Sequence, residues 1–337
     1  MQTAIADYLK SKLPGSPDVS VANLHRIPGG ASRETWSVDA EWKEDGQSVS
    51  RGFIFRRDPD ASVLVTERDI EFQVMSVARN HGVPVPQMYW LEQDGDWLER
   101  PFFVMERIDG CETSPMIVLM DPRFYPARER IGEQFVAVLE RIHVMDANDP
   151  DLAFLGPVPT PESCAATEID RWDEILARDA LEPQPVLRGA LSWLRRNLPP
   201  PAQRVVLVHA DYRTGNYLCS PEGEITGMLD WEMAHLGDPM EDVGWACIRP
   251  WRWMGNEQVG GLMEREQFYR MYTEATGIDV NEEAVRFWEV LGNLKLAAIC
   301  VTGGRSFCDG RTHSPMMAFL SRNFARLELE IMDLMEA

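Results

Sequence analysis

The sequence predicts an α+β protein with two lobes: a small N-terminal lobe built on an antiparallel sheet, and a larger C-terminal lobe that is mainly helical. Residues 21–57 contain strand-like runs, whereas the chain from residue 257 to its end repeats apolar side chains at helical spacing almost throughout. The length of 337 residues fits about two domains. We therefore expect residues 1–107 to form one domain and residues 108–337 the other.

The small lobe is expected to begin with a helix over residues 2–13, which a Pro-Gly pair ends. Strands follow within residues 21–57, and Asp45-Gly46 supplies a hairpin turn. Apolar side chains at helical spacing predict a helix over residues 63–78. The segments QMYWLE and FFVMERI, separated by the polar turn QDGDW, predict two further strands. The lobe is thus a small sheet with one central helix.

The large lobe is expected to start with helices over residues 128–146 and 168–198, the second of which ends at three consecutive prolines. Short apolar strands, VVLV and NYLCS, then follow, and the turn PEGE leads into a third strand, ITGMLD. From residue 257 onward we expect helices. The sequence contains no internal repeat and no low-complexity tract.

The chain is strongly acidic, with 33 Lys and Arg residues against 54 Asp and Glu residues and a formal charge of −21. Such acidity argues against binding to nucleic acid or to an anionic membrane, because both need clustered Lys and Arg. Residues 1–107 carry a net charge of −5 and residues 108–337 one of −16. The excess fits either a cationic small molecule or simple solubility, and composition does not distinguish the two.

The N-terminal sequence MQTAIADYLKSKLPG lacks the basic flank and apolar run of a signal peptide, and no segment approaches the ~18 consecutive apolar residues of a membrane span. The six cysteines are far apart and form no CxxC pair, which argues against a zinc site or a disulfide framework. These features predict a cytoplasmic protein.

The most informative segment is VVLVHADYRTGNYLCSPEGEITGMLDWE, residues 205–232. It places His209 and Asp211 after a strand, Asn216 five residues beyond that aspartate, and Asp230 at the end of a hairpin. This set suits phosphoryl transfer, in which one carboxylate accepts a proton from a hydroxyl while an amide oxygen and a second carboxylate hold Mg²⁺. The alternative is that these are surface turn residues, but their positions at strand ends favour a site.

This segment resembles the catalytic loop and metal-binding hairpin of the protein-kinase-like fold, and most closely those of the aminoglycoside phosphotransferase and choline kinase group. The resemblance implies ATP and Mg²⁺ as cofactors. It implies that Asp211 is the catalytic base, that Asn216 and Asp230 are the Mg²⁺ ligands, and that His209 braces the catalytic loop. Ala210 stands where this group often has glycine.

The same resemblance assigns cofactor-binding residues to the small lobe. The GGAS segment, with Gly29, Gly30 and Ser32, would fold its backbone amides around phosphate oxygens, although such a segment is also an ordinary turn. Arg56 replaces the lysine that the kinase fold normally has on its third strand, and an arginine also binds phosphates. Glu71 would be the helix partner of Arg56, with the glutamate one turn earlier as the alternative.

A hinge between the lobes is expected at FFVMERIDG, where Met105, Glu106 and Arg107 would meet the adenine edge, unless Met105 is plain core. Further along the chain, HLGDPMEDVGW also resembles the family. There we expect Asp242 to bind backbone near the catalytic loop, and Glu232 to be an exposed loop carboxylate.

Two classes of acceptor remain open. A cationic acceptor, such as an aminoglycoside or choline, would need carboxylates or aromatic faces. Candidate aromatic residues are Trp172, Trp251 and Trp253. An anionic acceptor would instead use arginines, for which the candidates are Arg249, Arg252, Arg305 and Arg311. Core packing and surface pairing are the other interpretation of all these residues.

The wider pattern favours the anionic class. FIFRRDP, VPVP, LDWE, GDPMEDVGW and LGNLKLAAICVTGGRSF together resemble the kinase-like domains fused to some acyl-CoA dehydrogenases. This resemblance implies an enzyme that transfers the ATP γ-phosphate to a small-molecule hydroxyl, such as that of a hydroxyacyl compound. The alternative function is that of a nucleotide-binding pseudokinase or regulatory module, which the change to Arg56 would suit and the complete set of Asp211, Asn216 and Asp230 argues against.

Overall fold

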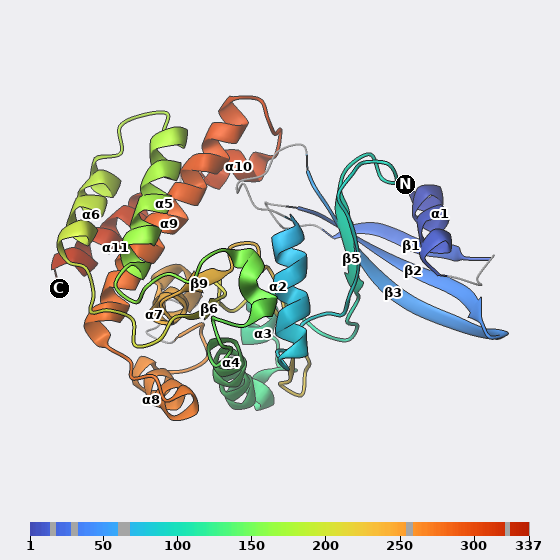
Figure 1. Cartoon of the computed structure of the whole chain (residues 1–337), viewed down its shortest axis with the longest axis horizontal. Helices are drawn as coiled ribbons and strands as arrows, with labels where there is room; N and C mark the ends of the chain where they lie inside the picture. Colours follow the sequence, from blue (N-terminus) through green and yellow to red (C-terminus); the bar gives the residue numbers. More distant parts are fainter. Residues whose placement is uncertain (14–17, 28–32, 60–67, 254–258, 321–323, 337) are drawn as a thin grey trace.

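A computed structural model describes residues 1–13, 18–27, 33–59, 68–253, 259–320 and 324–336. The N-terminal lobe is a five-stranded antiparallel sheet with the strand order β1-β2-β3-β5-β4 and two helices (Figure 1). Its elements are α1 (Gln2–Lys12), β1 (Ser20–Ile27), β2 (Glu34–Glu44), β3 (Gln47–Arg57), α2 (Arg68–Asn80), β4 (Met88–Glu92) and β5 (Phe102–Glu106).

The two faces of this sheet bury different helices, because successive side chains of a strand point to opposite sides. Phe53 and Phe55 of β3 pack in one cluster with Tyr8 of α1. Ile54, between them, packs on the other side in a cluster with Val74 of α2. The predicted turn at Asp45-Gly46 is present, and both residues have positive φ, 50° and 81°, as a tight hairpin turn requires.

The C-terminal lobe is mainly helical, as predicted, and surrounds two short two-stranded sheets, β6 with β9 and β7 with β8. The 27-residue helix α9 crosses the lobe and packs against α5, α7, α10 and α11 (Figure 1). The α-helices and strands are α3 (Pro115–Met120), α4 (Arg128–His143), α5 (Cys164–Asp179), α6 (Pro185–Arg196), β6 (Val206–Val208), β7 (Tyr217–Cys219), β8 (Ile225–Met228), β9 (His235–Gly237), α7 (Met240–Cys247), α8 (Arg265–Thr276), α9 (Glu282–Cys308), α10 (Pro315–Leu320) and α11 (Phe324–Glu336). Three short 3₁₀ helices are η1 (Tyr125–Ala127), η2 (Pro150–Leu155) and η3 (Arg249–Arg252).

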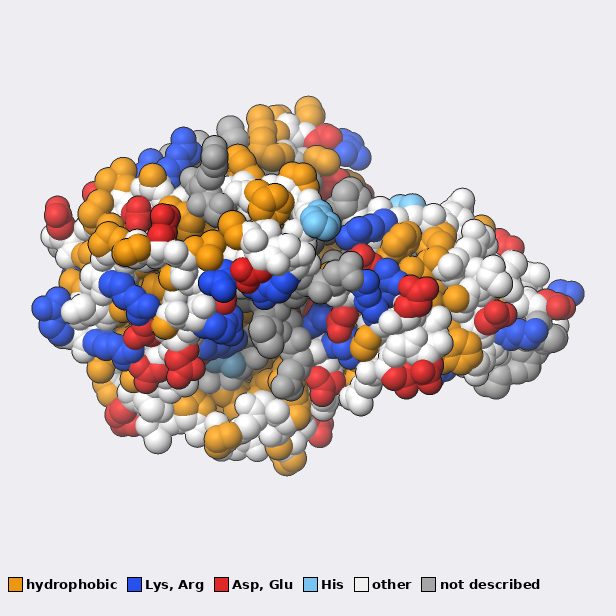
Figure 2. All heavy atoms as spheres, turned by 90° about the horizontal axis from the view of Figure 1, so that it is seen from above, with side chains coloured by type: hydrophobic (Ala, Val, Ile, Leu, Met, Phe, Trp, Pro, Cys, Tyr) orange, Lys and Arg blue, Asp and Glu red, His pale blue; other side chains and the backbone are white. Residues whose placement is uncertain are grey.

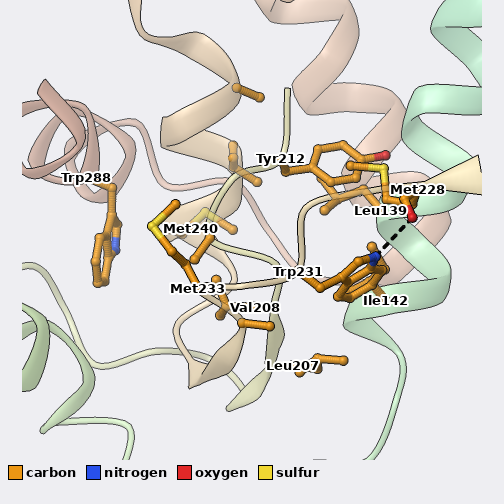
Figure 3. Packing of buried hydrophobic residues seen from close by; sticks show 14 of the residues in the cluster. Leu139, Ile142, Leu207, Val208, Tyr212, Met228, Trp231, Met233, Met240 and Trp288 are labelled. Carbon is orange, nitrogen blue, oxygen red and sulfur yellow. Dashed lines mark hydrogen bonds between the residues drawn. The ribbon is translucent and has the colours of Figure 1, made fainter. Parts of the chain in front are cut away.

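The segment that carries the predicted catalytic residues rests on a buried apolar floor (Figure 3). Tyr212, next to Asp211, is fully buried, and its hydroxyl donates to the backbone carbonyl of Phe135 in α4 at 2.5 Å. Trp231, next to Asp230, is equally buried and donates to the Met228 carbonyl at 3.1 Å. Each predicted polar residue is therefore adjacent to an aromatic anchor that fixes its backbone.

One expected element is wrong. The helix predicted over residues 168–198 is two helices, α5 and α6, with the break at residues 180–184. Pro183 and Pro185 lie at this break, and Pro185 is the first residue of α6, where a proline is tolerated because its missing N–H has no helical partner. Strand β9 and helix α3 were not expected, because both are too short for apolar residues to repeat at strand or helix spacing.

Acidic and basic side chains are intermixed on the face that Figure 2 shows. Within the described residues, no helix is long and apolar enough to cross a membrane.

The crossing of α7 and α9 gives a test of the fold. A Cβ atom on Gly244 of α7 would lie 2.7 Å from the Cβ of Trp288 in α9, so the Gly244→Ala variant should lose about 1–3 kcal/mol of unfolding free energy through overpacking. Gly189→Ala is the control. It lies in exposed helix α6 with nothing within 4 Å of the new Cβ, so it should be neutral or stabilising by up to about 1 kcal/mol. Urea unfolding measures both, and equal midpoints would contradict the packing described.

Candidate active site

A cleft of about 850 Å³ lies between the two lobes and is lined by residues of both. The predicted site residues that line it are Arg56, Met105, Glu106, Arg107, Asp211, Asn216 and Asp230. Glu71 and His209 are fully buried and contact residues of this set. Gly29, Gly30 and Ser32 lie outside the described residues, as does the alternative helix partner Glu67.

Asp211 follows β6 and its carboxylate is oriented by three donors. Trp245 Nε1 of α7 donates to Oδ1 at 2.9 Å, and Arg213 Nε donates to the same oxygen at 3.0 Å. Asn216 Nδ2 donates to Oδ2 at 2.6 Å. The side chain is 16% exposed, so this carboxylate is held in place yet accessible from the cleft.

Asn216 joins Asp211 to the hairpin that carries Asp230. Its amide nitrogen donates to both the backbone carbonyl and the carboxylate of Asp211, at 2.9 and 2.6 Å. Its backbone carbonyl accepts from the Leu229 amide at 2.7 Å. Because its nitrogen faces Asp211, the amide oxygen is the atom that Asn216 has for a cation.

His209 is held within the loop by hydrogen bonds, and the described residues that line the cleft do not include it. Its Nδ1 accepts from the Asp211 amide at 3.2 Å, so Nε2 carries the proton and donates to the Leu229 carbonyl at 3.0 Å. Burial lowers the pKa of His209, and the nearby Asp242 carboxylate offsets only part of this effect. The ring is therefore neutral and structural.

Asp242 confirms a further expectation, because its carboxylate binds the backbone of the catalytic loop. It is fully buried and accepts from the amides of His209 and Ala210 at 2.7 and 2.8 Å. Ala210 has a φ of 65°, in the left-handed region. Glycine adopts this conformation without strain, whereas the Cβ atom of alanine adds a modest conformational energy. The alanine at position 210 is therefore strained, but the backbone conformation is still accessible to it.

Arg56 lies at the base of the small lobe and connects it to the large one. Its guanidinium is 3.2 Å from Glu71 Oε1, which is the pairing that the sequence suggested, and 2.8 Å from Asp230 Oδ1. Burial would raise the pKa of Asp230, but the charge of Arg56 and its hydrogen bond outweigh this and hold the pKa below its ordinary value. Asp230 is therefore a carboxylate at neutral pH, with its side chain 37% exposed.

The oxygen atoms that Asn216 and Asp230 offer show whether this part of the cleft suits a divalent cation. Asn216 offers an amide oxygen, and Asp230 offers an ionised carboxylate whose backbone follows the Leu229 amide that Asn216 binds. A small set of hard oxygen ligands is what Mg²⁺ takes from proteins, with phosphates and waters completing its shell. The residues present therefore fit Mg²⁺.

At the hinge, the side chains of the predicted residues are tied to the sheet. Arg107 is 2.5 Å from Asp39 and 2.7 Å from Asp109, and Glu106 accepts from the Gln87 amide at 3.0 Å. The backbone amides of Glu106 and Arg107 donate to carbonyls of Gln87 and Gly52. The side chains and the backbone amides of Glu106 and Arg107 are thus occupied within the small lobe.

The sequence analysis did not identify three candidate functional residues, Arg33, Arg213 and Trp245. Arg33 shares Glu71 with Arg56, at 2.7 Å, and lies 2.6 Å from Asp58. The position of Arg213, two residues after Asp211, was a usable signal. Trp245 gave none, because only the folding of α7 against the loop brings its indole to Asp211.

Other expectations need correction. Glu232 is half-buried and lines the cleft instead of standing exposed. The four arginines expected near the acceptor are not among the described residues that line the cleft. They pair with carboxylates elsewhere: Arg249 with Glu330, Arg252 with Glu289, and Arg305 and Arg311 with Asp309. Of the three tryptophans, Trp251 lines the cleft and Trp172 is buried core.

The chain is similar in sequence to parts of curated proteins that are much longer than itself. The mouse (Mus musculus) acyl-CoA dehydrogenase family member 10 is 28% identical over 291 residues, which cover 82% of this chain and 26% of that protein. The rat (Rattus norvegicus) acyl-CoA dehydrogenase family member 11 is 26% identical over 307 residues, which cover 87% of this chain and 38% of that protein. The chain thus spans well under half the length of these relatives.

Solved structures show the fold. A putative aminoglycoside phosphotransferase from Ralstonia eutropha superimposes with a TM-score of 0.74 at 21% identity, over 100% of this chain and 98% of that one. A thermostable mutant of aminoglycoside phosphotransferase APH(4)-Ia, in a ternary complex with AMP-PNP and hygromycin B, gives 0.60 at 17% identity, over 99% and 98%. A choline/ethanolamine kinase family protein from Mesorhizobium loti gives 0.59 at 17% identity, over 100% and 98%.

These neighbours confirm the two-lobed, kinase-like α+β fold that the sequence predicted. The sequence itself matches the phosphotransferase enzyme family over residues 23–288, which is most of the chain. The protein therefore belongs to the phosphotransferase enzyme family.

Proposed function

We propose that this protein transfers the γ-phosphate of MgATP to the hydroxyl group of a small molecule. The observation that carries the proposal is the convergence of Asp211, Asn216 and Asp230 on one cleft that both lobes line. Phosphoryl transfer needs a residue that orients the attacking hydroxyl, oxygen ligands for Mg²⁺ and a cation for the phosphates, and these residues with Arg56 supply all three.

The adenine base would lie between apolar side chains of the two lobes. Ile54 and Met105 come from the sheet, and Leu218 and Leu229 come from the hairpin of the large lobe. Gly227 of β8 lets the hairpin approach Ile108, which lines the cleft, because a Cβ there would lie 3.0 Å from Ile108 Cδ1. A flat base between such walls, with its edge on the hinge backbone, matches the general form of a nucleotide site.

At the phosphate end of the cleft, Arg56 would bind the phosphates, and Asn216 and Asp230 would bind Mg²⁺. Bound Mg²⁺ would neutralise the charge that develops on the transferred phosphoryl group. In the structure Arg56 and Asp230 pair with each other. Bound MgATP would replace this ion pair by two others, one between Arg56 and phosphate and one between Asp230 and Mg²⁺. Glu71 keeps Arg56 in position from the buried side.

Asp211 would accept the proton of the attacking hydroxyl. Trp245 and Arg213 fix its Oδ1 and Asn216 fixes its Oδ2, so the carboxylate is oriented before an acceptor arrives. Holding a base in its reacting geometry lowers the entropic part of the barrier.

For the acceptor, we propose a small hydroxyl compound with an apolar body, such as a hydroxyacyl compound. The part of the cleft beyond Asp211 is lined by apolar side chains of the large lobe, namely Met233, Trp245, Trp251, Leu296 and Ile299. Arg213 lies over the Trp251 ring at 4.4 Å and brings a positive charge to this wall. A polycationic aminoglycoside would need more carboxylates than this wall offers.

A screen of ATP consumption tests the acceptor class. We expect turnover with hydroxyacyl-CoAs to exceed turnover with aminoglycosides, choline or amino sugars, because the acceptor wall is apolar. ATP and GTP should be compared in parallel. Turnover confined to a cationic acceptor would reject the hydroxyacyl assignment and leave the phosphotransferase proposal intact.

The Asp211→Asn variant tests the base. It removes the proton acceptor and leaves both metal ligands, so kcat should fall by about 10²–10⁴-fold while MgATP affinity stays close to that of the wild type. Steady-state kinetics and nucleotide titration measure the two quantities. Wild-type turnover in this variant would rule out the mechanism. Tight MgATP binding by the wild type without transfer to any acceptor would support a non-catalytic nucleotide-binding module instead.

The Asp230→Ala variant tests the metal ligand. In the presence of Mg²⁺ it should bind ATP about tenfold or more weakly, whereas in EDTA its affinity should equal or exceed that of the wild type because Arg56 is released for phosphate. Asp170→Ala is the control, since Asp170 is an exposed carboxylate outside the cleft that pairs with the surface residue Arg195. An unchanged Mg²⁺ dependence in Asp230→Ala would refute the ligand role.

A further inference from the structure

A chain of buried charged side chains lies behind the catalytic loop, on the side away from the cleft. Glu168 of α5 is 3.6 Å from His235 Nε2, and Glu241 of α7 is 3.2 Å from the same nitrogen. Glu241 Oε1 is in turn 3.2 Å from Lys295 Nζ of α9. Glu168, Glu241 and Lys295 are 5%, 6% and 2% exposed. The phosphotransfer mechanism described above uses none of them.

The chain ends on the backbone of the catalytic loop. Lys295 Nζ donates to the backbone carbonyl of Ala210 at 2.5 Å. This carbonyl belongs to the peptide unit whose amide nitrogen is that of Asp211, and that amide donates to His209 Nδ1. Both ends of the peptide plane that leads into Asp211 are therefore held, one by Lys295 and the other by His209.

Lys295 also contacts the residue that orients the Asp211 carboxylate. Its ammonium group lies 4.6 Å from the centre of the Trp245 ring, and the Nε1 of that ring donates to Asp211 Oδ1. A cation over an indole face is attracted by the ring. Lys295 thus acts on Asp211 by two routes, through the backbone and through Trp245.

We propose that Lys295 is a positioning residue for Asp211, and that Glu168, His235 and Glu241 keep its ammonium group in place. The left-handed conformation of Ala210 is strained, and a strained peptide persists only where its surroundings fix it. Asp242 fixes its amide side and Lys295 its carbonyl side. The inference rests on the proposed role of Asp211 as the base.

His235 completes the chain as an imidazolium. Its Nδ1 donates to the Met233 carbonyl at 3.0 Å, so a second proton on Nε2 places a positive charge 3.2 Å from Glu241 and 3.6 Å from Glu168. The charged groups that face it are Glu168 and Arg171 of α5 and Glu241 of α7, with Lys295 of α9 beyond Glu241. Burial lowers the pKa of His235, but Glu168 and Glu241 outweigh this and raise it to about 9.

Glu168, His235 and Glu241 would also suit a metal ion, since their ligand atoms all lie within 4.8 Å of one another. However, Lys295 and Arg171 already offset the charges of the two carboxylates. A divalent cation would therefore bury two further positive charges, whereas a proton on His235 adds only one.

The Lys295→Met/Glu241→Gln double variant tests the positioning role. Lys295→Met alone would deprive the buried Glu241 of one of its two cationic partners, whereas removal of both charges keeps the shapes and much of the stability. We expect the double variant to fold and its kcat to fall by about 10- to 100-fold at unchanged KM for ATP. Arg265→Met/Glu289→Gln is the control: Glu289 is a buried carboxylate of the same helix α9, and it pairs with Arg265 of α8 away from the catalytic loop. It should keep wild-type kcat.

Wild-type kcat in the folded double variant would overturn the proposal, as would an equal loss in the control. This failure is distinct from failure of the proposed function, which would appear as an absence of phosphotransfer by the wild type itself. Lys295→Arg, which restores a cation, should recover part of the lost kcat relative to Lys295→Met.

A second measurement needs no activity. Because the pKa of folded His235 is raised from 6.5 to about 9, its ionic contribution to stability is complete below pH 6.5 and is lost as the pH rises through about 9. The stability advantage of the wild type over His235→Gln should therefore be largest below pH 6.5 and shrink up to pH 9. A constant difference across this range would overturn the imidazolium assignment. Stabilisation by Zn²⁺ alone, reversed by EDTA and absent in His235→Gln, would do so as well.

Discussion

The site depends on one buried carboxylate, that of Asp242. It accepts from two successive backbone amides, those of His209 and Ala210, and lies 3.1 Å from His143 Nε2. The carboxylate fixes these two amides, and directly after them the backbone turns at Ala210, whose φ is positive. The bend turns Asp211 toward the cleft, and Asn216 and Leu229 then bring the hairpin with Asp230 beside it.

A second set of charges joins the two lobes. Asp58, Arg33, Glu71, Arg56 and Asp230 follow one another as alternating acids and bases, from the sheet and α2 across the cleft to the large lobe. Removal of one member would leave its buried neighbours without compensation, which costs more than the net value of any single pair. The orientation of the small lobe over Asp211 is therefore sensitive to the charge of the ligand at the phosphate end.

The sequence predicted those parts of the protein that local patterns encode. Strands β2 and β3 alternate, α4 repeats at helical spacing, and the residues from 205 to 232 carry their spacing along the chain. The fold class could therefore be predicted without coordinates, and Asp211, Asn216 and Asp230 could be chosen as candidates. The acceptor wall could not, because it is assembled from separate elements: Trp251 from η3 and Leu296 from α9. Arg249 and Arg252 could not be placed for the same reason, since their carboxylate partners are distant in the sequence: Glu330 is 81 residues from Arg249.

Helix α9 carries two kinds of residue on neighbouring positions. Leu296 and Ile299 line the cleft on the side proposed for the acceptor, while Lys295, the residue before Leu296, donates to the backbone of the loop before Asp211. A shift or rotation of this helix to admit a bulkier acceptor would therefore also displace the peptide before Asp211. Acceptor preference can diverge among related chains through Met233 and Trp251, which lie outside α9, whereas the backbone of α9 is constrained by its second task.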